Sequence, residues 1–163
     1  MSAPIYKGGL PFFKSGTRQK YKVNASGAAT VSLAASQSNE CFLFDTASGV
    51  VYTLPAASPG LMFSFCVTVS VTTNSYKVIT KTPASEFLIG ELIGYNTAST
   101  DASLGFHGDG SANVAVTQQA ASTNATGGLQ GSWIDFFCLT TGLWIVDGSY
   151  LSGTTATTPF ANS

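Results

Sequence analysis

Charged residues are scarce in this chain of 163 residues, and their scarcity limits what its surface can do. Asp, Glu, Lys and Arg make up 9% of the sequence, against roughly a quarter in ordinary soluble domains. Ser and Thr together supply about a quarter of the residues instead, so polarity comes from hydroxyl groups. A surface of this kind has little charge repulsion and a low cost of desolvation. The composition favours a subunit that functions in an assembly, and a small secreted β-domain is the alternative.

Histidine, cysteine and long apolar runs are also rare. The chain has one histidine and three cysteines, Cys41, Cys66 and Cys138, with no CxxC spacing. An odd and dispersed set argues against a disulfide framework and against a zinc site. We expect small buried side chains in a protein assembled in a reducing cytoplasm, with the oxidation of one pair left open. No run is long enough for a membrane span, and the start MSAPIYKGGLPFFK has no apolar signal-peptide core.

Acidic residues are missing from the first 39 positions, where the basic residues gather. Five of the seven bases are Lys7, Lys14, Arg18, Lys20 and Lys22, and the remaining chain holds two bases and eight acids. A basic segment on an acidic body is expected to contact an acidic surface, on a sister subunit or on a partner. Nucleic acid is the competing partner. The segment is too sparse in charge and too rich in Pro and Gly for it, so we expect no nucleic-acid binding.

The first 22 residues are expected to form an extended arm. Pro4, Gly8, Gly9, Pro11 and Gly16 oppose a stable helix there. The arm also carries two adjacent aromatic residues, Phe12 and Phe13. These need burial against a neighbouring molecule or against the core of their own chain.

Short apolar segments separated by turn residues fill most of the remaining chain. The pairs 40–44 with 50–54 and 132–139 with 143–146 indicate β-hairpins. The alternating run LMFSFCVTVSV at 61–71 indicates a strand whose Phe63 and Phe65 side faces the core. Its other side, with Met62, Ser64 and Cys66, carries no charge and raises the question of what covers it. Residues 75–80 indicate another strand. Residues 86–93 fit a strand or a short helix, and their glycines favour a bent strand, whereas 96–113 resemble a loop.

These segments predict an all-β fold in one domain. We expect a β-sandwich or jelly-roll-like domain over 23–147, an N-terminal arm over 1–22 and a second extended arm over 148–163. Phe160 would anchor the second arm. No long sequence period indicates a solenoid or propeller.

No catalytic motif stands out in the sequence. His107 has Asp101 and Asp109 nearby, but no nucleophile elbow accompanies them. The stretch DGSAN at 109–113 resembles the opening of a calcium loop, yet Ala120 occupies the position of the closing acid. Glu86 and Glu91 lack the aromatic platforms of a glycosidase. Trp133 and Trp144 are expected to pack inward. We therefore expect no enzyme activity, no cofactor and no metal.

Three stretches in order resemble a widespread group of small virion proteins of tailed phages. They are FLFDTASGVVYTLPAA at 42–57, SYKVIT at 75–80 and GGLQGSWIDFFCLTTGLWIVDGSYLSGTTATTPF at 127–160. The resemblance implies a capsid decoration, or cement, protein that binds the outside of the assembled major capsid protein shell. It also implies a β-sandwich or jelly-roll fold and a homotrimer or homodimer. The group offers no catalytic residues to transfer, and the N-terminal arm lies outside the matching region.

Taken together, the sequence predicts a protein made in the bacterial cytoplasm and located on the capsid surface of a virion. Its candidate contacts with the shell or with sister subunits are the following residues: Lys7, Phe12, Phe13, Lys14, Arg18, Lys20, Lys22 and Phe160. A tail or head-fibre receptor-binding module is the alternative, although the chain shows no stalk pattern. A hydrolase built around His107 is a third hypothesis.

Overall fold

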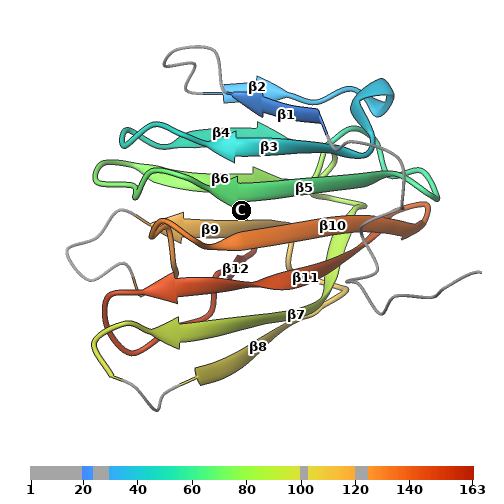
Figure 1. Ribbon diagram of the computed structural model, residues 1–163. Coiled ribbons are helices and arrows are strands. Elements are labelled where there is room, and N and C mark those ends of the chain that lie inside the picture. Colours follow the sequence, from blue (N-terminus) through green and yellow to red (C-terminus); the bar gives the residue numbers. More distant parts are fainter. Residues whose placement is uncertain (1–19, 24–29, 100–102, 120–124) are drawn as a thin grey trace, which may run out of the picture.

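The computed structural model contains two mixed β-sheets that pack face to face (Figure 1). It describes residues 20–23, 30–99, 103–119 and 125–163. Sheet A has the strand order β1-β3-β5-β10-β11-β7-β8, and sheet B has the order β12-β9-β6-β4-β2. The prediction of an all-β single domain is confirmed. Within the described ranges, no helix is long and apolar enough to cross a membrane.

The strands are short in the first half of the chain and longer in the second. Sheet A consists of β1 (Lys20–Val23), β3 (Glu40–Phe44), β5 (Met62–Val67), β7 (Phe87–Asn96), β8 (Ser103–Asp109), β10 (Trp133–Thr140) and β11 (Leu143–Ser152). Sheet B consists of β2 (Thr30–Ser32), β4 (Val50–Thr53), β6 (Ser75–Ile79), β9 (Ala115–Gln119) and β12 (Phe160–Ala161). One 3₁₀ turn, η1 (Ala35–Gln37), precedes β3.

The first six strands wind between the two sheets. Each successive strand changes sheet, so β1, β3 and β5 pair in parallel in sheet A while β2, β4 and β6 pair in parallel in sheet B. One turn of this winding takes about 20 to 26 residues, the separation of partners such as Lys20 and Glu40 or Val50 and Tyr76. This winding is a regular strand arrangement that no long period in the sequence indicates.

The predicted hairpin between 40–44 and 50–54 is also wrong, because β3 and β4 lie in facing sheets. The turn between them crosses from one sheet to the other and stacks on the equivalent turn after β5. Thr72 N–H donates to Ala47 O at 2.8 Å, and the side-chain amide of Asn74 donates to Ser48 O at 2.9 Å. At Gly49, which has a φ of 76°, a Cβ would lie 2.5 Å from Ser75 O, so only glycine fits this stacked turn.

Aromatic side chains fill the space between the sheets. The rings of Phe44 and Tyr76 stack with centroids 4.3 Å apart, and the Phe42 and Phe65 rings stack at 5.7 Å. Tyr52 of sheet B packs 5.3 Å from Phe65 of sheet A. Ring pairs of this kind add specific geometry to the burial of large apolar area, which fixes how the two sheets face each other.

The second half of the chain closes both sheets. The predicted hairpin of β10 and β11 is confirmed. All of the segment 86–93 except its first residue falls in a strand, β7, that pairs in parallel with β11. The interpretation of 96–113 as a loop is wrong for residues 103–109. These form the edge strand β8, whose mostly exposed side chains give little apolar signal in the sequence.

The predicted C-terminal arm over 148–163 needs correction. Residues up to Ser152 continue β11, and β12 pairs with β9 through Phe160 and Val116. Phe160 is only 7% exposed and belongs to the core. The Tyr150 hydroxyl donates to Thr157 O at 2.6 Å, which holds the connection between the two strands. The tail is therefore part of the sandwich, because its Ser- and Thr-rich connection carries apolar side chains at the positions that face inward.

One buried polar side chain in the described part of sheet B has no hydrogen-bond partner to offset its burial. Gln118 of β9 is 1% exposed, and neither its amide nitrogen nor its amide oxygen has a hydrogen-bond partner in the described part of the chain. Burying an unpaired amide costs free energy that an apolar side chain of similar shape does not.

We expect Gln118→Met to raise the free energy of unfolding by about 1–2 kcal/mol, because it removes this unpaired amide and keeps the side-chain length. Urea denaturation followed by circular dichroism measures the difference. The matched control is Gln119→Met at the exposed neighbouring position, which should change stability by no more than about 0.5 kcal/mol. A Gln118 variant less stable than the wild type would contradict the interpretation.

Candidate functional site: the outer face of sheet A

Sheet A turns one face toward sheet B and the other away from it. Along its strands, alternate side chains such as Phe63, Phe65, Phe136 and Val146 belong to the core. The intervening residues form the face that we call the outer face. This answers a question raised by the alternating run at 61–71: Met62, Ser64 and Cys66 lie on the outer face and are half-buried.

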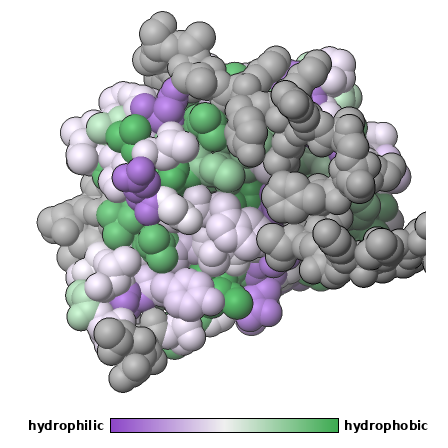
Figure 2. All heavy atoms as spheres, viewed as in Figure 1, coloured by the Kyte–Doolittle hydropathy of each residue, from purple (hydrophilic) through white to green (hydrophobic). Residues whose placement is uncertain are grey.

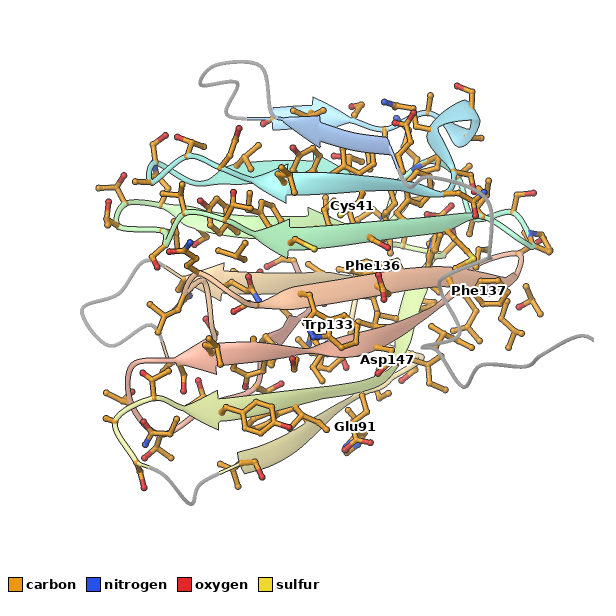
Figure 3. All side chains as sticks on the ribbon, in the orientation of Figure 1. Cys41, Glu91, Trp133, Phe136, Phe137 and Asp147 are labelled. Atoms are coloured by element: carbon orange, nitrogen blue, oxygen red, sulfur yellow. The ribbon has the colours of Figure 1, made fainter. Side chains whose placement is uncertain are left out.

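A row of polar residues crosses the outer face at one level. The register pairs Ser64 with Asp135, Asp135 with Asp147, Asp147 with Glu91, and Glu91 with His107. We call Asp135, Asp147 and Glu91 the acidic row. Residues directly opposite each other on one face lie about 5 Å apart between Cβ atoms. Figure 3 shows Asp147 and Glu91 on the adjacent strands β11 and β7.

The carboxylates of this row repel one another because they carry like charges. Asp135 is 9% exposed, and its burial, together with the nearby charge of Asp147, raises the pKa of its carboxyl above 3.8. A hydrogen bond from Ser64 acts in the opposite direction on that pKa. Asp147 and Glu91 are exposed. Like charges placed opposite each other destabilise a sheet, so the row is a place where a positive group would gain energy.

Apolar side chains flank the acidic row on both sides. One flanking row joins Met62, Phe137, Ile145 and Ile89, and the other joins Leu43, Cys66, Trp133, Ser149 and Ile93. Ile89 and Ile93 are each 38% exposed, and Tyr95 nearby is 43% exposed. Figure 2 views this side and shows hydrophobic and hydrophilic residues next to each other. The outer face therefore combines apolar area with negative charge.

Lysine and arginine are absent from the described part of this face, where His107, across from Glu91, is the one histidine. Among the residues whose side chains the structure describes, only Lys77 and Lys81 are lysines and none is an arginine. Lys77 belongs to β6 of sheet B, and its Nζ donates to Ser163 O at 2.5 Å. Lys81 follows the same strand. Neither neutralises the acidic row, which lies on the other sheet.

Two cysteines meet beside the acidic row. Cys41 of β3 donates its S–H to Cys66 Sγ of β5 at 3.6 Å, and all three cysteines are free. This donation lowers the pKa of Cys66 and raises that of Cys41, and burial raises the Cys41 pKa further. Burial also raises the pKa of Cys138. Cys66 is half-buried and the other two are buried, so Cys66 is the most reactive thiol of the three.

Two carboxylates of the catalytic hypotheses, Asp109 and Glu86, are engaged elsewhere in the structure, and Asp101 lies outside the described residues. Three backbone N–H groups, of Ser111, Ala112 and Asn113, donate to the Asp109 carboxylate and lower its pKa to about 2. Asp109 thus closes a turn and does not orient His107. Glu86 is buried and accepts from the backbone N–H of Ala57 and of Thr82, so it does not pair with exposed Glu91. Among the described residues, no group of His, Cys, Asp and Glu could hold a metal ion.

The predicted contact residues divide into three groups. Lys7, Phe12, Phe13, Lys14 and Arg18 lie outside the described residues. Lys20 and Lys22 fall in β1, the edge strand of sheet A, so the boundary of the arm lies before residue 20. Phe160 is a core residue, and its proposed role as an outward contact is wrong.

Sequence reasoning did not find the acidic row. Its members come from β7, β10 and β11, and only the parallel pairing of β7 with β11 brings Glu91 beside Asp147. Asp135 and Asp147 had one usable signal, since both face outward in the predicted hairpin at equivalent positions. The expectation that both tryptophans pack inward holds for fully buried Trp144, whereas Trp133 is half-buried on the outer face.

Comparison of the chain with protein-family models, with curated proteins and with solved structures finds no match in any of the three.

We expect Asp135→Asn to stabilise the protein at neutral pH, because the wild type must ionise a buried carboxyl there. The raised pKa means that the folded state holds its proton more tightly than the unfolded state, so wild-type stability falls as pH rises through that pKa. The variant should lose its advantage below the unfolded pKa of about 3.8. Urea denaturation between pH 3 and pH 8 measures the difference, and a variant equally stable across that range would refute this account.

We expect iodoacetamide to modify Cys66 before Cys41 and Cys138, with a rate that follows the lowered pKa of Cys66. Replacing the S–H donor in Cys41→Ala should shift the rate profile of Cys66 to higher pH. Cys138→Ala is the control and should leave that profile unchanged. Mass spectrometry of timed samples reads each site. Faster modification of Cys41 than of Cys66 would overturn the assignment of donor and acceptor.

Proposed function

We propose that this chain is a structural virion protein that binds the outside of an assembled phage capsid and stabilises it. The observation that carries the proposal is the outer face of sheet A, which offers exposed apolar side chains beside the acidic row. The motif order of 42–160, which resembles phage decoration proteins, points in the same direction.

Binding by area is the mechanism that such a face supports. Burying apolar surface contributes roughly 25 cal/mol per Å², and a protein present in many copies on one shell gains further from multivalency. The exposed residues at the β7 side of the face, Ile89, Ile93 and Tyr95, are the contacts that we assign to the major capsid protein. A homotrimer or homodimer would multiply these contacts.

The low charge of the chain supports the same function. Each buried charge without a partner costs several kcal/mol, and hydroxyl groups can exchange water for hydrogen bonds across an interface. A chain in which 9% of residues are charged therefore loses little when a second protein covers its surface. The proposal places the protein on the capsid surface, with no nucleic acid, membrane or cofactor in its function.

We expect the purified protein to co-sediment with phage shells that lack it, saturating at a fixed ratio to the capsid subunit. Ile93→Ser should weaken this binding about fivefold to tenfold, because it removes apolar area worth about 1–1.4 kcal/mol at the interface. Val69→Ser is the matched control, since Val69 is equally exposed at 38% but lies after β5 and off the outer face.

Two results would contradict the proposal. Wild-type protein that stays in the supernatant at every shell concentration would refute capsid binding, and binding to host cells instead would identify a receptor-binding module of a tail or head fibre. Equal loss of binding in both serine variants would refute the assignment of the contact to the outer face.

A further inference from the structure

We propose that the basic N-terminal segment, residues 1–19, docks on the outer face of sheet A in its own chain, with its Lys and Arg side chains on the acidic row. The proposal concerns the isolated protein and does not depend on capsid binding. It assigns an occupant to a sheet face that the two-sheet core leaves uncovered.

Charge complementarity supports this occupant. The acidic row holds three carboxylates on neighbouring strands, with His107 across from Glu91 at its end. No lysine or arginine whose side chain the structure describes lies on that face. Residues 1–19 contain Lys7, Lys14 and Arg18 and no acid. They hold three of the seven Lys and Arg residues of the chain. Docking would relieve the opposition between Asp135 and Asp147, which lie directly across from each other.

Apolar complementarity accompanies the charges. The acidic row runs between two rows of apolar side chains that include Trp133, Phe137 and Ile145. The N-terminal segment interleaves its bases with apolar residues of its own, among them Phe12 and Phe13. An aromatic pair next to basic residues suits a surface on which apolar and acidic rows alternate.

The chain enters the sheet at the right place for this docking. Lys20 begins β1, the edge strand of sheet A, and pairs with Glu40 of β3. The next residue of β3, Cys41, pairs with Ser64 and therefore lies in line with the acidic row. Strands are about 4.8 Å apart, so Asp135, Asp147 and Glu91 lie roughly 14, 19 and 24 Å from β1 across the sheet. An extended chain covers about 3.3 Å per residue, so the segment from Arg18 to Lys7 spans roughly 7 to 43 Å from Lys20 and passes all three.

Burial on the outer face fits a cover that comes from the β1 side. Cys41 is 1% exposed and Asp135 is 9% exposed, although both are outside the core between the sheets. Asp147 and Glu91, which are farther from β1, are exposed. Figure 3 shows Cys41, Asp147 and Glu91 in this order across the sheet. Attachment to the same chain favours docking in cis, because a short tether gives a high effective concentration.

Trypsin provides the test, because it cleaves after the bases of the segment. In the full-length protein we expect cleavage at Lys14 and Arg18 to be slower than in a synthetic peptide of residues 1–22. The double variant Asp147→Asn with Glu91→Gln should be cleaved there roughly threefold to tenfold faster than the wild type, since each exposed charge pair contributes modestly. Raising NaCl from 0.05 to 0.5 M should accelerate wild-type cleavage relative to the peptide.

Two controls distinguish loss of docking from other causes of faster trypsin cleavage in the N-terminal segment. Asp45→Asn removes one carboxylate at a turn outside the acidic row and should leave the rate unchanged, whereas the matched single variant Asp147→Asn should raise it. Cleavage after Lys77 in β6 reports unfolding of the body and should stay slow in every variant. Equal cleavage rates in the wild type, the acidic-row variant and the peptide would overturn the proposal. Protection that grows with protein concentration would overturn docking in cis and assign the face to the arm of a second copy.

Discussion

The structure depends on aromatic packing between two sheets that the chain builds at the same time. Because the first six strands cross from one sheet to the other at every step, no sheet of this half can form from neighbouring segments alone. The stacked rings of Phe44 and Tyr76 join β3 of sheet A to β6 of sheet B, which are more than one turn of the winding apart. The chain must therefore lose the entropy of closing long loops before most strand pairs form, which is typical of slowly folding β-proteins.

The same winding decides which residues share the outer face. Parallel pairing places Cys41 beside Ser64, and Glu91 beside Asp147, although these partners are far apart in the sequence. The face that results carries apolar rows and like charges together, a combination that a monomer in water would not retain for stability alone. This is why both of our proposals, capsid binding and docking of the N-terminal segment, use this face.

The sequence was sufficient for local features and insufficient for the pairing between distant strands. Alternation predicted that Phe63 and Phe65 face the core, and the turn at Gly142 predicted the hairpin of β10 and β11, because both signals are local. The connection at Asp45–Gly49 has the residues of a hairpin turn, yet it joins facing sheets. Turn chemistry alone does not determine which sheet receives the next strand. The acidic row depends on that choice and was missed for the same reason.

Phe160 and the N-terminal segment illustrate how composition and burial separate two kinds of extended chain. Phe160 and the phenylalanines of the N-terminal segment all lie in stretches rich in small residues. Phe160, however, pairs with Val116 in the register and belongs to the core. The N-terminal segment differs by its charge, since it holds the bases that the body lacks. Because the bases and the acids lie in different parts of the chain, the strongest electrostatic attraction within it acts between the N-terminal segment and the acidic row. Any partner of the outer face, a capsid included, must match or displace that attraction.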